Sequence, residues 1–438
     1  MPLVEPVTTA TFPSSRPIFP PAPARRQHPS RHPLVPILPF DGDANKPGTA
    51  ADADERRGPT RSRENTSQSP ERHAHGHRRV LRCREEGRMT DYLHWMANHT
   101  NTRWWADSIE PGFLDSAIAT GATGATSNPF LVHQAIASDR GVWSGEIAGV
   151  LAGTPAGAGR AVELTRLAVT HAADVLLPVY ERAGGADGYV CAQVDPGAAA
   201  DRAAMLELAR TYHAWRPNIS VKLPTTAAGL DVLETCVAEG ISCTMTVSFT
   251  APQIALVADR FARARSRAID VGREPGRCHA VMMIGRLDDY LRDVALDSHV
   301  GVAEADIRLA GIVTTRRVLP ILQAAGEGFD LIVAALRGTH HLTALVGERV
   351  IMSIAPSIRR LIDDERLAIG AVRSSLREGD AADDQTAVAR LSTLREFTRA
   401  YDPDGIAPPD FLTFGATQRT LAQFVESGWK LLEQFGQK

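Results

Sequence analysis

Short apolar runs rich in β-branched residues alternate with longer helical patterns along most of this chain. The clearest example covers residues 217–249, where an apolar strand (219–223) is followed by a helix (227–239) and a second apolar strand (241–249). Gly240 marks the end of the helix between them. A strand, helix and strand in this order predict a βαβ unit, whose two strands are normally parallel.

The same alternation recurs through the rest of the chain after residue 88. The pattern predicts eight strands, at 102–108, 121–127, 188–195, 219–223, 241–249, 279–287, 330–336 and 350–356. It also predicts helices between or after these strands, at 111–119, 159–181, 198–215 and 417–434. This strand count predicts an α/β fold, a (β/α)8 TIM barrel formed by residues 89–438. The surplus length is expected in helical insertions, chiefly 289–325, and in an acidic, loop-like region at 366–409.

Residues 1–88 differ from the rest in composition. They are crowded with Pro, Arg, Ser and His and have almost no periodic apolar pattern, so we expect a disordered extension. A transit peptide is disfavoured by the acidic residues at 41–55, and a basic interaction tail is the alternative. In a GC-rich genome Glu85-Glu86-Gly87 would be encoded by a purine run resembling a ribosome-binding site. Met89 is therefore a candidate for the true start, which mass spectrometry of the natural N-terminus would test.

The composition excludes several classes of protein. With 44% hydrophobic and 23% charged residues the chain can bury a large core, and a net charge of −3 gives no reason to expect nucleic-acid binding or a polybasic membrane surface. No apolar run approaches the roughly eighteen residues of a membrane span. The five cysteines lack a metal or disulfide spacing, which indicates a reducing, cytoplasmic location.

Lys222 is the anomaly of the central βαβ unit, because it stands between Val221 and Leu223 inside an apolar strand. Burial disfavours a charged ammonium, so such a lysine either reaches solvent from an edge strand or serves as an amine nucleophile. The segment VKLPTTAAGL, followed by AEGISCTMT, resembles the Schiff-base lysine strand and the next strand of the transaldolases, which are class I aldolase relatives built on a (β/α)8 barrel. The resemblance runs from Thr102 to Leu432 and favours the nucleophile.

The resemblance implies a role for each residue that matches the family pattern. Lys222 would form a Schiff base with a ketose phosphate, and Asp107 would be the general acid/base. Substrate hydroxyls would be bound by Asn128, and the catalytic water would be held by Thr246. The alternatives are that Asp107 caps the following helix, that Asn128 only forms a turn and that Thr246 only packs.

Two arginines at expected strand ends complete the implied site. Arg286 and Arg337 match the phosphate-binding arginines of the family, although either one alone is more often a surface ion-pair residue. The neighbouring pair His340-His341 has no third ligand at a metal spacing, so we interpret it as structural or surface-exposed. The lysine supplies the electron sink, and no cofactor or metal is implied.

Two positions depart from the ordinary transaldolase pattern. Gln193 replaces the glutamate that relays protons through the catalytic water, and Thr244 replaces an asparagine that contacts the Schiff-base region. Glutamine can orient a water molecule but cannot take its proton at neutral pH. Gln193 instead resembles the A-Q-V motif of the fructose 6-phosphate aldolase branch.

Three hypotheses on function follow. The first is a transaldolase, a transferase of aldehyde or ketone groups in the pentose phosphate pathway. The second is a specialised transaldolase or fructose 6-phosphate aldolase-like enzyme that makes an unusual sugar in secondary metabolism. The third is a catalytically silent sugar-phosphate-binding barrel. Sugar phosphates are the expected partners, without nucleic acid or membrane, and a homodimer is one option for assembly.

Overall fold

The computed structural model describes residues 92–138, 141–370 and 378–437. The extension predicted at 1–88 and the proposed start at Met89 lie outside these ranges. Seven parallel strands form one sheet in the order β1-β7-β6-β5-β4-β3-β2. Their bounds are β1 Arg103–Ala106, β2 Val190–Gln193, β3 Ile219–Pro224, β4 Cys243–Thr246, β5 Cys278–Met283, β6 Phe329–Ala334 and β7 Ile351–Ile354.

A short extended segment at 123–127 closes this sheet into a barrel. Ala125 bridges Ala106 on β1 and Val190 on β2, the two strands at the edges of the sheet. The backbone N–H of Ala106 donates to Gly124, and that of Cys191 donates to Ala125. The predicted strand 121–127 is therefore present as a bridging segment rather than a full strand, and the (β/α)8 barrel predicted from the sequence is confirmed.

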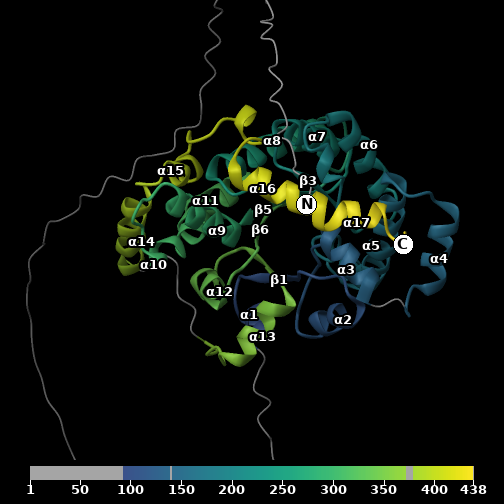
Figure 1. Cartoon of the computed structure of the whole chain (residues 1–438), viewed down its shortest axis with the longest axis horizontal. Coiled ribbons are helices and arrows are strands. Elements are labelled where there is room, and N and C mark those ends of the chain that lie inside the picture. The colour runs from purple at the N-terminus through teal and green to yellow at the C-terminus, as the bar shows by residue number, and fades with distance from the viewer. Residues whose placement is uncertain (1–91, 139–140, 371–377, 438) are drawn as a thin grey trace, which may run out of the picture. The chain divides into compact units, whose positions relative to one another are not determined.

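Helices surround the strands (Figure 1). The helices before β5 are α1 Tyr92–His99, α2 Pro111–Ala119, α3 Pro129–Ser138, α4 Ser144–Gly153, α5 Ala158–Arg182, α6 Arg202–His213, α7 Ala227–Ala238 and α8 Ala251–Asp270. Those after it are α9 Ile284–Asp297, α10 Glu304–Ile307, α11 Ala310–Ala325, α12 Thr339–Leu345, α13 Pro356–Asp364, α14 Glu378–Leu391, α15 Arg395–Tyr401, α16 Gly415–Phe424 and α17 Lys430–Glu433. None of these helices is both long and apolar enough to cross a membrane.

The loop-like interpretation of 366–409 was wrong. Helices α14 and α15 occupy much of this region. Ala387, Leu391 and Leu394 are buried at helical spacing, and Phe397 is fully buried. The acidic residues Asp383 and Asp384 stand just before this stripe, at an exposed and a half-buried position, and gave this region its polar appearance in the sequence.

The central βαβ unit matches the sequence prediction closely. Thr226 caps α7 by accepting a hydrogen bond from the backbone N–H of Gly229, at 3.0 Å. A side chain at Gly229 is impossible without movement, since a Cβ there would lie 1.9 Å from the carbonyl oxygen of Pro224. Gly240 then ends the helix with a φ of 88°.

Ion pairs cluster at the N-terminal end of the barrel. Arg103 contacts Asp187 at 2.6 Å and Asp330 at 2.5 Å, and Arg277 also contacts Asp330, at 3.1 Å. Burial alone would raise the pKa of Asp330, but Arg103, the nearby His279 and Arg277 together outweigh burial, and the pKa lies below its ordinary value. This end of a (β/α)8 barrel generally serves stability rather than catalysis.

His279 lies inside the barrel on β5. It packs against Trp105 and Tyr189, with ring centroids 4.9 and 5.2 Å away, and its Nδ1 contacts the hydroxyl of Ser220 at 3.2 Å. Burial lowers the pKa of His279 to about 3, with Asp330 opposing this only in part. The folded protein therefore keeps a neutral imidazole where the unfolded chain would bind a proton.

This imidazole predicts acid sensitivity. Between its ordinary pKa of 6.5 and its folded pKa of about 3, the unfolded state holds more protons, so stability is complete above the first value and falls with pH below it. Lowering the pH from about 7.5 to 5 should cost about 2 kcal/mol through this group, at ~1.36 kcal/mol per unit. Urea titrations of His279→Gln should show a correspondingly smaller pH dependence. Ser220→Ala keeps the imidazole and should retain the wild-type dependence; equal slopes in all three proteins would contradict the assignment.

Candidate active site

Lys222 points into the barrel from β3. This strand lies between β2 and β4, so the edge-strand interpretation of the lysine was wrong. In register it is flanked by Gln193 on β2 and Thr244 on β4. Only 6% of Lys222 is exposed, and its Nζ donates a hydrogen bond to the carbonyl oxygen of Ser127 at 2.9 Å. The structure thus holds a buried amine at a fixed place.

A cavity of about 220 Å³ opens above this amine at the C-terminal ends of the strands. Active sites of (β/α)8 barrels lie at this end. Six of the eight residues chosen from the sequence line the cavity: Asp107, Asn128, Lys222, Thr246, Arg286 and Arg337.

Asp107 follows β1 and faces the cavity with one hydrogen-bond partner from the closing segment. The hydroxyl of Thr126 donates to its Oδ1 at 2.6 Å, and Thr126 is itself 2.8 Å from the hydroxyl of Ser353 on β7. The alternative that Asp107 caps the next helix was wrong, because the N-cap residue of α2 is Glu110, without a side-chain cap. A carboxylate held in this way can exchange a proton with a bound substrate.

Asn128 and Thr246 also have partners inside the protein. Oδ1 of Asn128 accepts from the backbone N–H of Leu131 at 3.1 Å, so the residue both lines the cavity and begins α3. The hydroxyl of Thr246, at the end of β4, lies 3.9 Å from the sulfur of Met283. This weak contact leaves the hydroxyl suited to binding a water molecule or substrate.

Arg286 lies in the first turn of α9, not at the end of a strand as predicted. Strand β5 stops at Met283 because the helix begins at Ile284. Burial, together with the charge of Arg337, lowers the pKa of Arg286 to about 10. Its Nη1 donates to Gln423 at 2.6 Å, and its guanidinium lies 5.3 Å from the ring centre of Phe424. Arg337 pairs with Asp289 at 2.8 Å, and two guanidinium groups in one cavity can together bind an anion there.

The C-terminal helix supplies one wall of this cavity. Gln423 and Phe424 reach it from α16, the yellow helix that lies across the barrel strands in Figure 1. The predicted single helix at 417–434 is interrupted by a π-helical turn, η3 (Val425–Trp429). Gly428 lies in this turn, where a Cβ would be 2.5 Å from the backbone nitrogen of Phe130. The close approach of the π turn to α3 holds α16 at the cavity.

Gln193 and Thr244 are not among the described residues that line the cavity. The hydroxyl of Thr244 contacts the hydroxyl of Ser220 at 2.7 Å and the sulfur of Cys191 at 3.4 Å. Gln193 is 3% exposed, and its Oε1 has no hydrogen-bond partner among the described residues. An unpaired buried amide oxygen beside Lys222 can accept a hydrogen bond from a water molecule or substrate.

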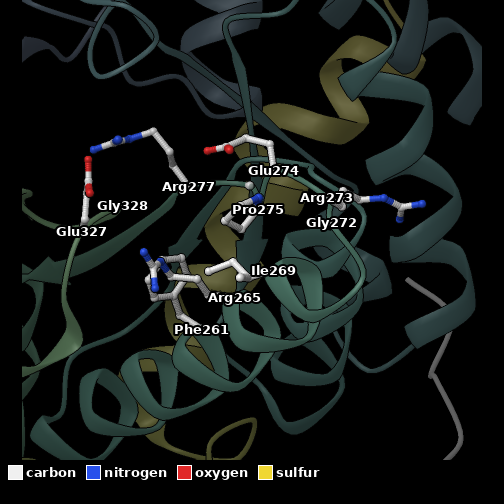
Figure 2. Close-up of a pocket in the computed structure, with 11 residues that line it drawn as sticks. Phe261, Arg265, Ile269, Gly272, Arg273, Glu274, Pro275, Arg277, Glu327 and Gly328 are labelled. Atoms are coloured by element: carbon white, nitrogen blue, oxygen red, sulfur yellow. The ribbon is translucent and has the colours of Figure 1, made fainter.

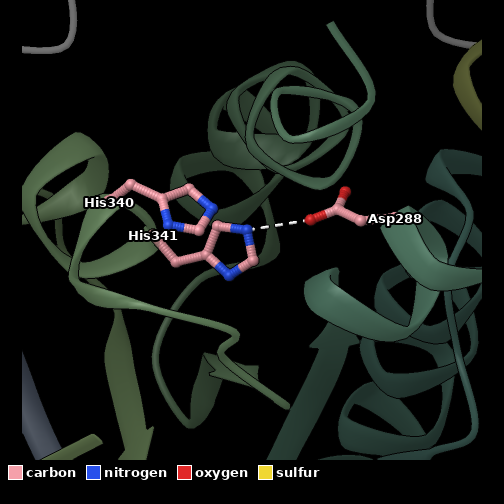
Figure 3. A group of neighbouring side chains, drawn as sticks. All are labelled: Asp288, His340 and His341. Carbon is pink, nitrogen blue, oxygen red and sulfur yellow. Dashed lines mark hydrogen bonds and ion pairs between the residues drawn. The ribbon is translucent and has the colours of Figure 1, made fainter. Parts of the chain in front are cut away.

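Asp288, His340 and His341 form the one cluster of potential metal ligands among the described residues, with ligand atoms within 4.8 Å of one another (Figure 3). Sequence spacing had not indicated Asp288 as a third member. Nδ1 of His341 accepts the backbone N–H of Arg337 at 3.2 Å, so its Nε2 carries the proton and donates to Asp288 at 2.9 Å. The expectation from the sequence that these histidines have no third ligand nearby was wrong, because Asp288 lies within reach. In the structure the contact between His341 and Asp288 is a buried hydrogen bond within the fold.

A larger hollow, of about 470 Å³, lies beside the loops that precede β5 and β6 (Figure 2). Arg265, Arg273 and Arg277 line it together with Glu274 and Glu327. In Figure 2 the guanidinium of Arg277 is directed toward Glu327, and Arg273 points away. This hollow carries charges of both signs, and it lies at the N-terminal ends of the strands, away from the cavity that holds Lys222. We therefore assign no catalytic or binding role to it.

The fold and the cavity define a (β/α)8 barrel with a buried lysine, a carboxylate and two arginines at its C-terminal face. Residues 104–403 match the family described as Transaldolase/Fructose-6-phosphate aldolase, and the chain belongs to this family. A transaldolase of Neisseria gonorrhoeae is 26% identical over 331 residues, 68% of this chain and 94% of that protein. Transaldolase 1 of Streptomyces coelicolor is 34% identical over 248 residues, 55% of this chain and 61% of its own length.

Proposed function

We propose that this protein is a transaldolase, an enzyme that transfers a dihydroxyacetone unit from a ketose phosphate to an aldose phosphate through a Schiff base on Lys222. One observation carries the proposal: a buried amine and a carboxylate share a small cavity with two arginines. The amine suits carbonyl chemistry, the carboxylate suits proton transfer and the arginines suit a phosphate. Sedoheptulose 7-phosphate and fructose 6-phosphate are the proposed donors, as in the pentose phosphate pathway.

The proposed reaction begins when Nζ of Lys222 attacks the carbonyl carbon of the ketose, and loss of water gives the Schiff base. Asp107 then takes the proton of the hydroxyl on the fourth carbon. The bond between the third and fourth carbons breaks, its electron pair moves toward the protonated imine, and an aldose phosphate leaves. The resulting enamine attacks the acceptor aldehyde, Asp107 returns the proton, and water releases the product ketose.

The two arginines would hold the phosphate at the far end of the substrate. Arg286 is largely buried, and Arg337 lies close enough to lower its pKa. A phosphate dianion between them would remove this repulsion and form charge-assisted hydrogen bonds. The distance from amine to phosphate would then select the length of the substrate.

Gln193 favours a second candidate, a specialised transaldolase or fructose 6-phosphate aldolase-like enzyme. Its side chain cannot relay a proton as a glutamate can, and its unpaired Oε1 lies on the strand beside Lys222. In cleavage, water would then take the place of the acceptor aldose phosphate. In synthesis, free dihydroxyacetone would take the place of the donor ketose phosphate. Product analysis separates the two candidates, because transfer gives a new ketose phosphate and aldol cleavage gives free dihydroxyacetone.

The decisive experiment incubates the full-length protein with fructose 6-phosphate and erythrose 4-phosphate, reduces the mixture with borohydride and maps the labelled peptide. Sedoheptulose 7-phosphate together with an adduct on Lys222 would establish transfer. An adduct accompanied by free dihydroxyacetone would favour the second candidate. No adduct from any ketose phosphate would favour a silent sugar-phosphate-binding barrel and end both enzymatic proposals.

A further inference from the structure

The segment that carries Arg337 has an unusual backbone. It joins β6, which ends at Ala334, to α12, which begins at Thr339, and Ala335 within it has a φ of 60°. A residue with a side chain in this left-handed region is strained and persists only where its surroundings hold it. Contacts from α9 and α12 hold this segment.

The side chain of Arg337 is anchored to α9. Its Nε and Nη2 each lie 2.8 Å from Asp289, and its Nη1 donates to the carbonyl oxygen of Ala335 at 3.1 Å. Gly285, also on α9, allows this close approach, because a Cβ there would lie 2.3 Å from the oxygen of Ala335 and 2.5 Å from Cγ of Arg337. The same helix presents Arg286, so α9 contacts or carries both arginines.

The backbone of Arg337 is anchored separately through a buried relay. Its N–H donates to Nδ1 of His341, and Nε2 of His341 donates to Oδ2 of Asp288. The other carboxylate oxygen of Asp288 accepts from the backbone N–H of Gly311 at 2.8 Å. His341 and Asp288 are 0% and 1% exposed, so water does not compete for these bonds. Figure 3 shows the contact between the two side chains.

The relay has a fixed polarity. Asp288 is an acceptor on both oxygens when ionised, so the ring nitrogen that faces it must be protonated. The neutral imidazole then has one remaining lone pair, on Nδ1, and that lone pair faces the N–H of Arg337. Asp288 therefore determines which ring nitrogen of His341 can accept a hydrogen bond from the backbone N–H of Arg337.

We propose that His341, oriented by Asp288, is a positioning residue for anion binding: it fixes the backbone of Arg337 so that this guanidinium and that of Arg286 form one phosphate site. The proposal rests on the proposed function, in which these arginines bind the substrate phosphate. His341 and Asp288 are not among the described residues that line the cavity with Lys222. Loss of the relay should therefore weaken binding of phosphorylated ligands and spare the amine chemistry.

A matched pair of variants isolates the hydrogen bond to Arg337. His341→Leu and His341→Asn both lose the bond to Asp288, but only asparagine retains an acceptor near the place of Nδ1. His341→Leu should raise the KM for fructose 6-phosphate and the dissociation constant of inorganic phosphate about tenfold, the equivalent of about 1.4 kcal/mol. His341→Asn should stay within about threefold of the wild type on that scale. Trapping of unphosphorylated dihydroxyacetone on Lys222 should be the same in all three proteins.

Inorganic phosphate binding, measured by calorimetry, separates this proposal from the proposed function. A wild-type protein that binds phosphate but forms no adduct on Lys222 would end the proposed function and leave the positioning role intact. Equal losses in His341→Leu and His341→Asn, or wild-type phosphate affinity in His341→Leu, would overturn the positioning role, as would a wild-type protein that binds no phosphate. If His341→Leu does not fold, the same pair is compared in an Asp288→Asn background, which leaves no carboxylate buried without a partner.

Discussion

Lys222→Met is expected to lower transfer activity on the order of a thousandfold or more and to abolish the borohydride-trapped adduct. The reason is that Lys222 is the one lysine among the described residues that line the cavity, so the electron sink is lost and not merely weakened. Methionine has a similar length and no charge to bury, so the fold should survive or gain stability. Peptide mapping after borohydride reduction, at a saturating concentration of the ketose phosphate, measures the adduct. A thermal melt under the same conditions measures the stability of the fold.

Lys430→Met is the matched control for this substitution. Lys430 is the other lysine in the described part of the chain, where it pairs with Glu426 at 2.6 Å and is 47% exposed. Its replacement should change neither the adduct nor the rate, since an exposed ion pair contributes little to stability. Retained adduct in Lys222→Met, or loss of adduct in Lys430→Met, would show that the reactive amine is elsewhere.

The sequence predicted those residues of the site that interrupt a local pattern of apolar positions. Lys222 was visible because it interrupts an apolar strand, and Ser353 could have been found by the same signal in 350–356. Thr126 gave a weaker signal, since a threonine is ordinary in a strand. The barrel itself followed from the alternation of strand and helix, which is a property of short windows of sequence.

Other parts of the site depend on distant segments that no local pattern connects. Gln423 and Phe424 reach the cavity from α16, and Asp288 meets His341 across 53 positions of sequence. The placement of Arg286 was wrong because the apolar run of β5 continues into the buried first turn of α9, so the strand and the helix share one hydrophobic stretch. These features follow from tertiary packing and require the folded structure.

Asp107→Asn is expected to lower the rate of transfer about 10²–10⁴-fold, the range for loss of a general acid/base. The amide keeps an Oδ1 that can accept from Thr126, so the network with Ser353 and the shape of the cavity should persist. What is lost is the ability to take the proton from the hydroxyl on the fourth carbon. Carbon–carbon cleavage, not Schiff-base formation, should then limit the reaction.

Because Asp107→Asn should slow carbon–carbon cleavage but not Schiff-base formation, borohydride should trap a different adduct from that of the wild type. The identity of this adduct is a more specific readout than the rate. With fructose 6-phosphate, borohydride should capture the intact six-carbon phosphate on Lys222 of Asp107→Asn, whereas the wild type should also yield the three-carbon adduct. Asp115→Asn, an exposed substitution on α2, should behave as the wild type. A three-carbon adduct formed at the wild-type rate in Asp107→Asn would assign the proton transfer to another group. Since Asp107 has a direct hydrogen bond to Thr126 and Thr126 a contact with Ser353, the next variant would then be Thr126→Val, which removes the hydroxyl that joins them.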